Sequence, residues 1–354
     1  MSDNSSNLVA AMQSWLSVTD SRPPARLTLD EETARRLESS LQLTWSSKQK
    51  LMRYAGNAVL NRIPRRFYAP VTTGLKRALG RSTTRPEPEF RPGPYMDALA
   101  AQTEPAAATA GKTFVCLTHD IDRPECAAQW RAVIELEERH GFRSTSNVLT
   151  NGPYALDRAW LDELQARGHE IGLHGDTHDM AIGFRDPVAL RRRLQRCLER
   201  LDRPIRGFRA PALAITAPLL AVLDDLGFRY DSSVKANLFY SGGLDICAPF
   251  LSPGTRLWEL PLVLQDDGLF RDRDLSDEEA LADTRRIIAL CRRHRGLFVL
   301  NTHPVNLMGR MGFYERLLRE LVADESLEVT PAGVLVERLD QALDAATGTN
   351  TQSR

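Results

Sequence analysis

Residues 113–122 read TFVCLTHDID, an apolar run that ends abruptly in two carboxylates. Residues 114–117 are apolar and β-rich, which is typical of a strand buried on both faces. Asp120 and Asp122 follow two residues apart, where α/β folds place ligand-binding residues, just past the carboxyl end of a strand. A lone Asp here would be explained as a turn that caps the next helix. Two carboxylates favour a functional site, since buried carboxylates are costly unless paired, hydrogen-bonded or bound to metal.

Composition narrows the class of protein. The 354 residues suffice for one large domain with an appendage, and the 46 basic and 46 acidic side chains cancel, so no net charge points to nucleic acid. The five cysteines are scattered without a CxxC pair, which suits a reducing compartment. The first residues do not resemble a secretory signal, and no apolar run approaches the ~18–20 residues that span a bilayer. We therefore expect a cytoplasmic protein.

Strands and helices alternate from Gly111 onward. After the first strand, the predicted strands are 143–149, 169–174, 206–209, 228–231, 255–262 and 296–301, and the predicted helices are 126–140, 157–167, 187–201, one from near Pro218, and 277–294 with Ser276 as its N-cap. This alternation indicates βα units around a parallel sheet. Six or seven such units favour a barrel-like closure over a small open sheet.

The chain before this pattern differs in composition. Residues 1–86 are predicted as a helical and basic accessory region, 87–110 as a Pro/Ala-rich linker, 111–340 as the catalytic domain and 341–354 as a flexible tail. Residues 48–85 carry ten basic side chains and no acid, interleaved with aromatic and aliphatic residues. Such a segment can lie on an anionic membrane surface. A helical region packed on the main domain with solvated charges is the alternative, and Pro64 and Pro70 exclude one long amphipathic helix.

A second polar cluster, GHEIGLHGDTHD at residues 168–179, follows the predicted strand 169–174. His174 and His178 stand four apart, a spacing that can bring two imidazoles to one metal. With Asp120 and Asp122 they form a 2-His-1-carboxylate set with one carboxylate left over. A metal lowers the pKa of a bound water toward ~7, and a spare carboxylate can take the proton from that water. This combination predicts hydrolysis.

Three further strand ends carry polar residues: GFRAP with Arg209, YDSS with Asp231 and LNTHP with His303. An arginine beside a catalytic Asp would hold that carboxylate ionised, although a surface charge is the plain alternative. A histidine can protonate a leaving amine near neutral pH. The strand ends should therefore meet at one mouth.

The ordered set THDID, HGDTH, FRAP, YDSS and NTHP resembles the polysaccharide deacetylase family, the NodB-homology group of carbohydrate esterases, over roughly residues 112–320. The resemblance implies an α/β fold, a distorted (β/α)7-type barrel, here with an N-terminal helical and basic extension. It also implies a divalent metal, commonly Zn²⁺, and hydrolysis of an acetamido group on an amino sugar. Ile121 between the two aspartates is similar to a DxD subgroup whose relatives act on lipid-linked sugars and small amides.

The same resemblance assigns roles to residues. It implies that Asp120 is the general base, that Asp122, His174 and His178 hold the metal, and that His303 is the general acid. Arg209 would orient Asp120, Asp231 would tune His303, and a backbone N–H near Ala212 would help to form an oxyanion hole. Pro211, Ala212 and Trp258 are the expected substrate contacts. The Trp that the family usually has after its fourth-motif Asp is absent, and Trp258 can wall the site instead, although a purely structural strand explains it equally well.

Other classes of protein compete with this interpretation. A DxD-type glycosyltransferase would use Asp120 and Asp122 but leaves His174, His178 and His303 unexplained. A non-haem iron oxygenase uses a similar triad, usually on an all-β fold. A catalytically inactive carbohydrate-binding module would not need the complete set. We therefore expect a metal-dependent N-deacetylase that acts on an amino-sugar glycan or lipid-linked sugar in the cytoplasm.

Overall fold

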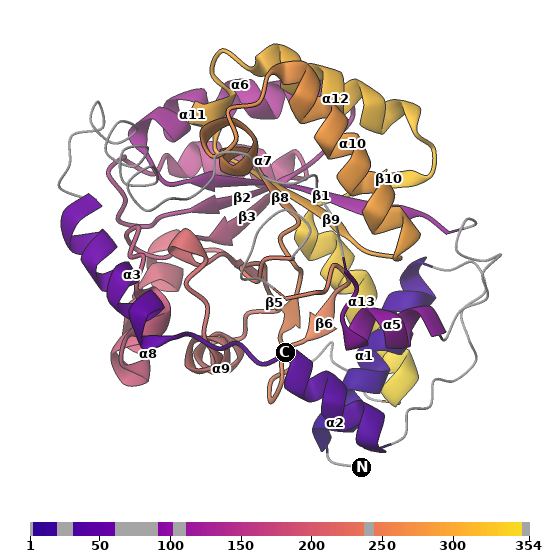
Figure 1. Ribbon diagram of the computed structural model, residues 1–354. Helices are drawn as coiled ribbons and strands as arrows, with labels where there is room; N and C mark the ends of the chain where they lie inside the picture. Colours follow the sequence, from indigo (N-terminus) through magenta and orange to yellow (C-terminus); the bar gives the residue numbers. More distant parts are fainter. Residues whose placement is uncertain (1–2, 20–30, 61–90, 102–110, 237–243, 349–354) are drawn as a thin grey trace.

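A curled sheet of ten strands forms the body of the protein (Figure 1). The structure is a computed structural model that describes residues 3–19, 31–60, 91–101, 111–236 and 244–348. Strand β1 (Thr113–Ile121) lies at the centre, and all nine of its residues are buried. It pairs in parallel with β2 (Thr145–Val148) on one side and β9 (Phe298–Thr302) on the other. The apolar run that precedes Asp120 is therefore the buried central strand that the sequence predicts.

Short strands extend the sheet on both sides of β1. The order is β6-β7-β5-β4-β3-β2-β1-β9-β8, with β10 beside the start of β1. The remaining bounds are β3 (Glu170–Leu173), β4 (Gly207–Phe208), β5 (Tyr230–Asp231), β6 (Phe250–Leu251), β7 (Trp258–Glu259), β8 (Leu264–Gln265) and β10 (Leu327–Val329). Nearly all neighbours are parallel, and β6 with β7 is the antiparallel pair.

One extended segment, residues 258–265, joins the two margins of the sheet. Its first part, β7, pairs with β5, and its last part, β8, pairs with β9. Between them the Leu260 N–H donates to the Asp231 carbonyl (2.9 Å) and the Val263 N–H donates to the Val299 carbonyl (3.1 Å). The segment thus closes the sheet, and the predicted distorted barrel is confirmed.

Helices cover the outside of the barrel (Figure 1). They are α6 (Pro124–Arg139), α7 (Arg158–Ala166), α8 (Pro187–Leu201), α9 (Ala217–Asp225), α10 (Asp277–Arg293), α11 (Pro304–Leu307), α12 (Met311–Ala323) and α13 (Ala332–Thr347). The helix α8 buries Leu190, Leu194, Cys197 and Leu201, a spacing that places them on one face. Each buried leucine contributes roughly 1.5–3 kcal/mol. Ser276 caps α10 in a capping box with Glu279, as predicted.

The described residues before the barrel form the helices α1 (Asp3–Thr19), α2 (Glu31–Ser40), α3 (Ser47–Leu60) and α5 (Pro94–Ala101). Trp15 of α1 is fully buried, donates its indole N–H to the Arg295 carbonyl (2.8 Å) and contacts the ring of Phe114 at the start of β1. This helix therefore covers the end of the barrel opposite the carboxyl ends of the strands. Trp45, just before α3, donates its indole N–H to the Ile215 carbonyl (2.7 Å), which attaches α3 beside the carboxyl ends of the strands.

The predicted domain boundaries stay predictions. Helix α5, with buried Tyr95, Met96 and Leu99, falls inside the range predicted as a linker, and α13 continues past residue 340. Much of the basic segment 48–85, from residue 61 onward, lies outside the described residues. In the part of the chain that the structure describes, no helix is both long and apolar enough to cross a membrane.

Candidate functional site

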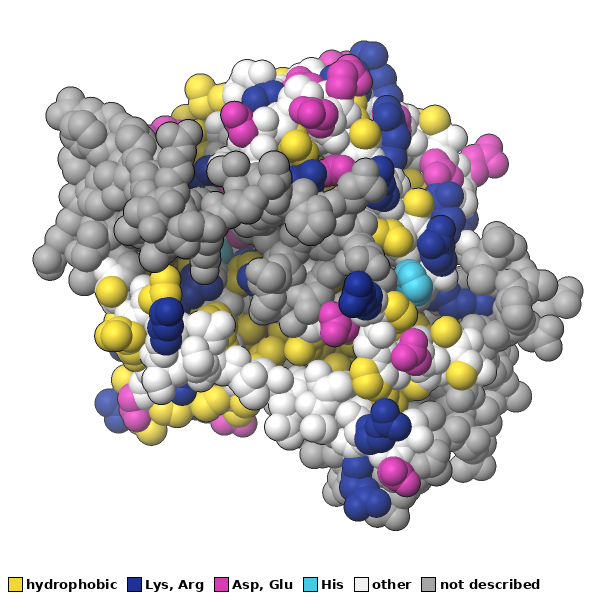
Figure 2. All heavy atoms as spheres, in the orientation of Figure 1, with side chains coloured by type: hydrophobic (Ala, Val, Ile, Leu, Met, Phe, Trp, Pro, Cys, Tyr) yellow, Lys and Arg dark blue, Asp and Glu magenta, His cyan; other side chains and the backbone are white. Residues whose placement is uncertain are grey.

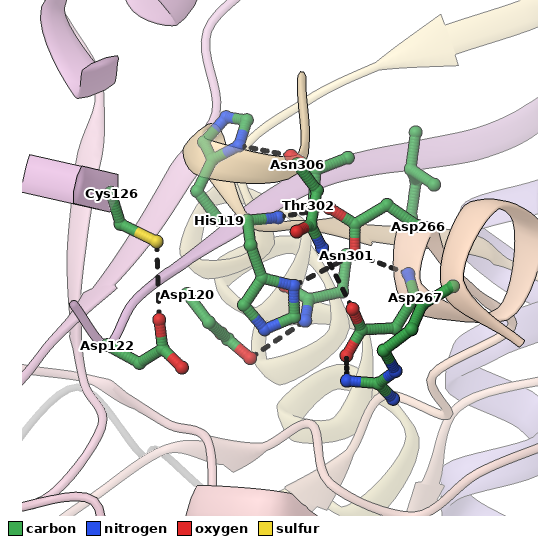
Figure 3. A network of polar contacts seen from close by, with 12 residues as sticks. His119, Asp120, Asp122, Cys126, Asp266, Asp267, Asn301, Thr302 and Asn306 are labelled. Carbon is green, nitrogen blue, oxygen red and sulfur yellow. Dashed lines mark hydrogen bonds and ion pairs between the residues drawn. The ribbon is translucent and has the colours of Figure 1, made fainter. Parts of the chain in front are cut away.

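The carboxyl ends of β1, β3 and β9 carry the residues that the sequence singles out. Asp120 is the second-last residue of β1, and Asp122 comes directly after that strand. His174 follows β3, and His303 follows β9. Figure 3 shows Asp120 between two groups, with Asp122 and Cys126 on one side and Asp266 and Asp267 on the other. Because β2, β1 and β9 are neighbours in register, their ends form one mouth, as predicted.

Asp120 is held by two amides. Asn147 Nδ2 donates to Asp120 Oδ1 (3.0 Å). Asn301 Nδ2 donates to Asp120 Oδ2 (2.7 Å), and Figure 3 shows these two residues side by side. Burial alone would raise the pKa of Asp120, but the charges of His174, Arg209 and His303 and the Asn147 hydrogen bond outweigh it and lower that pKa. Asp120 is therefore an ionised carboxylate in a fixed orientation, as a general base requires.

Gly172 makes room for one of these amides. It lies opposite Asn147 in the pairing of β2 with β3. A Cβ at this position would lie 2.3 Å from Asn147 Oδ1, closer than side chains approach one another. The glycine therefore lets Asn147 turn toward Asp120.

Asp122, His174 and His178 form the candidate metal centre. Asp122 is 7% exposed, and His178 Nε2 lies 4.0 Å from Asp122 Oδ2. The two imidazole rings are 5.4 Å apart between centroids. Burial would raise the pKa of Asp122, but the charges of His303, Arg123, His178 and His174 outweigh burial and lower that pKa. Burial and the His174 charge lower the pKa of His178 to about 4. At neutral pH the set offers a carboxylate and a neutral imidazole.

The hydrogen bonds of these residues fit a metal. His174 Nδ1 meets the Arg209 carbonyl at 2.8 Å, which leaves Nε2 as the nitrogen that can bind a metal. Metal-binding histidines commonly make such a bond through the second nitrogen, because it fixes the ring orientation. On the other flank, the Cys126 thiol and the Arg123 guanidinium donate to Asp122, each at 3.2 Å. One carboxylate and two imidazoles match the ligands of catalytic zinc sites.

A second cluster of possible ligands consists of Asp266, Asp267 and His303, whose ligand atoms lie within 4.8 Å of one another. His303 Nδ1 meets Asp266 Oδ1 at 2.8 Å. Asn306 donates to Asp267 Oδ1 (2.8 Å), and Arg271 pairs with Asp267 Oδ2 (2.6 Å). Since His303 Nδ1 and the Asp266 carboxylate bind each other and the Asp267 carboxylate is occupied by Asn306 and Arg271, we interpret the cluster as a hydrogen-bonded proton network.

The acidity of His303 follows from this network. Burial would lower its pKa, but Asp266, Asp267 and Asp122 raise the pKa to about 10. His303 is therefore protonated at neutral pH, and with Nδ1 directed to Asp266, Nε2 is the atom that can donate a proton. This arrangement suits a general acid.

Arg209 and Asp231 lie deeper than the sequence predicts. Arg209 is fully buried, and its Nη2 donates to Ser232 Oγ (3.0 Å) and Thr118 Oγ1 (3.4 Å). Its positive charge acts on Asp120, although the hydrogen bonds to Asp120 come from Asn147 and Asn301. Arg209 thus contributes charge rather than the direct contact expected of it.

Asp231 accepts hydrogen bonds from the Ser233 N–H (2.9 Å) and hydroxyl (2.8 Å). Burial raises its pKa, and burial together with Asp231 raises the pKa of the neighbouring Glu259. The contact to His303 that the sequence assigns to Asp231 is made by Asp266 instead. Asp231 is thus part of a buried carboxyl pair under the β5 end.

The expected substrate contacts separate in the structure. Pro211 and Ala212 follow β4 at the mouth, and Ala212 has a left-handed backbone (φ +51°) that is uncommon for a residue with a side chain. Such strain is typical of functional sites. Trp258, in contrast, is fully buried and donates its indole N–H to Asp340 of α13 (3.0 Å). We therefore leave Trp258 out of the proposed site, because it has no surface left for a substrate.

Sequence reasoning missed Asn147, Asn301 and Asp266. Asn301 stands in the LNTHP motif two residues before His303, where the histidine is the more obvious candidate for chemistry. Residues 144–147 read STSN, a polar run inside a strand in which every residue is buried. A buried polar strand is itself a signal of a site. Asp266 follows a two-residue strand and gives no such signal.

The chain is similar to a known protein family in sequence and to solved structures in fold. Residues 107–230 match the family model described as polysaccharide deacetylase. No curated protein matches the chain. A candidate polysaccharide deacetylase from Mycobacterium smegmatis has a similar structure, with 20% identity, a TM-score of 0.57, and coverage of 77% of this chain and 98% of that one. A candidate polysaccharide deacetylase from Pseudomonas aeruginosa PAO1 shows 12% identity, a TM-score of 0.51, and coverage of 65% and 91%.

The family match covers three of the five motifs in full: the one with Asp120 and Asp122, the one with the two histidines, and the one with Arg209. His303 and Asp266 lie beyond its end. The structural likeness, at these identities, supports the barrel alone. Residues 107–230 thus match the polysaccharide deacetylase family, the family that the ordered motifs resemble.

Proposed function

We propose that this protein is a metal-dependent hydrolase that removes an N-acetyl or related N-acyl group from an amino sugar. The family match and the fold support a deacetylase role. The observation that carries the proposal is the meeting of an ionised Asp120, a ligand triad and a protonated His303 at one mouth. Two observations support this arrangement: His178 Nε2 lies 4.0 Å from Asp122 Oδ2, and His174 and His303 both lower the pKa values of Asp120 and Asp122.

Asp122, His174 and His178 would hold a divalent metal, for which we propose Zn²⁺. When bound, such an ion supplies Lewis acidity, which polarises an amide carbonyl and makes water easier to deprotonate. The chain orients these ligands through Cys126, Arg123 and the Arg209 carbonyl.

The remaining chemistry comes from side chains of the mouth. Asp120 would take a proton from water on one of its carboxylate oxygens, each of which keeps a lone pair beside its amide hydrogen bond. The Ala212 N–H would donate to the oxygen of the tetrahedral intermediate. His303 would then donate the proton on Nε2 to the leaving amine, while Asp266 holds Nδ1 and stabilises the imidazolium.

For the substrate, we propose an amino-sugar glycan or a lipid-linked sugar in the cytoplasm. The five cysteines are all free and buried, which agrees with a reducing compartment. Peripheral contact with the inner membrane face through residues 48–85 is part of this proposal. Of that range, α3 exposes Leu51 (69%) and Met52 (57%) beside Lys48 and Lys50. Figure 2 shows hydrophobic and basic side chains together at the edge where Figure 1 places α3.

A vesicle assay tests the membrane contact separately. Wild type should co-sediment with vesicles of anionic phosphatidylglycerol, and a Leu51→Ser, Met52→Ser variant should do so less. Val322→Ser, which changes another exposed apolar residue (54%), is the matched control. Equal sedimentation of all three proteins would remove the membrane from the proposal and leave the chemistry untouched.

The function itself is tested by metal content and acetate release. Purified wild type should hold about one equivalent of a divalent ion and release acetate from N-acetylated amino sugars, and an Asp122→Ala, His174→Ala variant should do neither. Wild type that binds no metal, even after reconstitution, would contradict the hydrolase. Metal without acetate release, together with nucleotide-sugar binding, would favour the glycosyltransferase instead.

A further inference from the structure

The two histidines of the candidate metal centre are held in different ways. His174 is fixed by the sheet: its backbone N–H donates to the Val148 carbonyl (2.8 Å), and its ring Nδ1 donates to the Arg209 carbonyl (2.8 Å). His178 lies four residues further, in a loop between the end of β3 at Leu173 and the short helix at Ile182–Phe184. The HxxxH spacing aligns two imidazoles on a helix, but a loop imposes no such alignment. The position of His178 therefore depends on what holds the loop.

The side chain of Arg193, on helix α8, contacts loop residues both before and after His178. Arg193 Nε donates to Asp176 Oδ1 (2.6 Å), Nη2 donates to Thr177 Oγ1 (2.9 Å) and Nη1 donates to Asp179 Oδ2 (2.7 Å). Arg193 is about one-fifth exposed and Asp179 is 6% exposed, so these charged hydrogen bonds are largely shielded from water. Bonds of this kind are about twice as strong as neutral ones.

A backbone turn also spans His178, since the Asp179 N–H donates to the Thr177 carbonyl (2.7 Å), and further contacts attach the ends of the loop. Arg185 donates two bonds to Asp179 (2.8 and 3.0 Å), and the Asn151 N–H donates to the Asp176 carbonyl (2.6 Å). The Arg193 guanidinium joins the side chain of Asp176 to that of Asp179. The segment between those two residues contains His178.

We propose that Arg193 is a positioning residue for the metal centre, which fixes the loop so that His178 faces Asp122 and His174. This inference rests on the proposed function, because it assumes that these three residues bind metal. Partners that orient metal ligands typically affect metal affinity 10- to 100-fold when they are removed. Arg193 would do so without touching the metal or the substrate.

The planar guanidinium is essential to this role. Arginine presents several donors in a fixed fork, whereas lysine offers one compact ammonium that cannot reach three separated acceptors at once. An Arg193→Lys substitution therefore keeps the charge and the helix but loses the link across the loop. Arg191→Lys is the matched control, because Arg191 lies on the same helix in an exposed pair with Asp225 (2.8 Å).

The experiment is a Co²⁺ titration of metal-free protein, followed by visible absorption, with apo-protein Tm measured in parallel. We expect Arg193→Lys to weaken Co²⁺ binding about tenfold or more, and Arg191→Lys to leave it unchanged. The Arg193 variant should also show an altered Co²⁺ spectrum, which a change in stability alone would not produce. Asp176→Asn, which removes the negative charge that pairs with Arg193 at nearly unchanged volume, should weaken binding in the same direction, so the test survives if Arg193→Lys folds poorly.

The outcomes separate the inference from the proposed function. If wild type binds Co²⁺ and both Arg193→Lys and Asp176→Asn bind it with the same Kd and spectrum, the positioning role is wrong and the metal centre stands. If wild type itself binds no Co²⁺, the proposed function is wrong and the inference falls with it.

Discussion

Asp266 holds His303 at two points: Oδ2 accepts the His303 backbone N–H at 2.5 Å, and Oδ1 meets the ring Nδ1 at 2.8 Å. The backbone contact fixes the carboxylate, so the ring contact is directed rather than incidental. Asp266 is 1% exposed, and burial raises its pKa against the opposing charge of His303. The pair therefore keeps the proton on the histidine by geometry as well as by charge.

The pH profile should reveal this pair. The folded-state pKa of His303, about 10, exceeds the ordinary value of about 6.5, so the acid form is present below pH 10 and is lost above it. We expect Asp266→Asn to move the alkaline limb of kcat/KM to lower pH, because the neutral amide no longer stabilises the imidazolium. The rate at neutral pH should fall roughly 10²- to 10⁴-fold, the usual contribution of a general acid.

Asp231→Asn provides the comparison for that profile, since Asp231 is the partner that the sequence assigns to His303. In the structure Asp231 binds Ser233, so its replacement should leave the alkaline limb in place. A shift in the Asp231 variant without one in the Asp266 variant would return the role to Asp231.

Asn147 should determine the acid limb of the pH profile of kcat/KM. Its hydrogen bond helps to lower the pKa of Asp120, which must be ionised to act as a base, so activity is lost as pH falls through that pKa. We expect Asn147→Ala to move the acid limb to higher pH. The rate should fall about 10- to 100-fold, because hydrogen bonds to charged groups are worth about 1.5–3 kcal/mol.

Asn306→Ala is the matched amide deletion, because Asn306 donates to Asp267 rather than to Asp120. Its acid limb should coincide with that of wild type. An Asn147 variant with an unchanged acid limb would show that the amide does not act on the base. Gly172→Ala should imitate Asn147→Ala, since the new Cβ would displace the amide.

Metal should stabilise the fold as well as the reaction. A ligand at about 100 times its Kd stabilises the native state by about 2.7 kcal/mol. We expect Tm of wild type to fall when a chelator removes the metal and to recover when Zn²⁺ is added, whereas Tm of Asp122→Asn should respond little to either. A chelator-sensitive Tm in the variant would place the metal elsewhere, with the cluster of Asp266, Asp267 and His303 as the next candidate.

The sequence suffices for the parts of the site that lie at strand ends. Asp120, Asp122 and His303 each follow a strand whose apolar run is visible in the sequence, and parallel strands bring their carboxyl ends together by topology. His174 follows for the same reason. Their meeting needs only the order of the strands.

What could not be predicted depends on how the barrel closes. Asp266 reaches His303 because residues 258–265 cross from β5 to β9, and each of the two strands in that segment has only two residues. Asn147 and Asn301 face Asp120 through side-chain direction in neighbouring strands, where a register shift of one residue would turn them away. The motifs indicate which residue types form this site, but the register of the strands determines which side chains are in contact.

A buried network beneath the mouth should govern acid stability. His119, next to Asp120, meets Glu137 Oε1 through Nε2 (2.9 Å), and both residues are fully buried. Ser144 donates to Glu137 Oε2 (2.5 Å), and Tyr314 donates to Oε1. Burial would raise the pKa of Glu137, but His119 and these hydrogen bonds lower it. The stability from this carboxylate is therefore complete above its unfolded pKa of about 4.5 and is lost as pH falls through the folded value.

Removal of Glu137 should consequently be costly. We expect Glu137→Ala to reduce the free energy of unfolding by about 3–5 kcal/mol at pH 7, because it leaves His119 and two hydroxyls without their buried acceptor. Glu163→Ala removes an exposed partner of Arg167 and should cost at most about 1 kcal/mol. Urea unfolding of wild type and both variants from pH 7 to below pH 4 provides the measurement, because the Glu137 contribution is lost only below its unfolded pKa. Equal losses in the two variants would mean that the His119–Glu137 pair contributes no more than a surface ion pair, and that the floor of the site is held by packing alone.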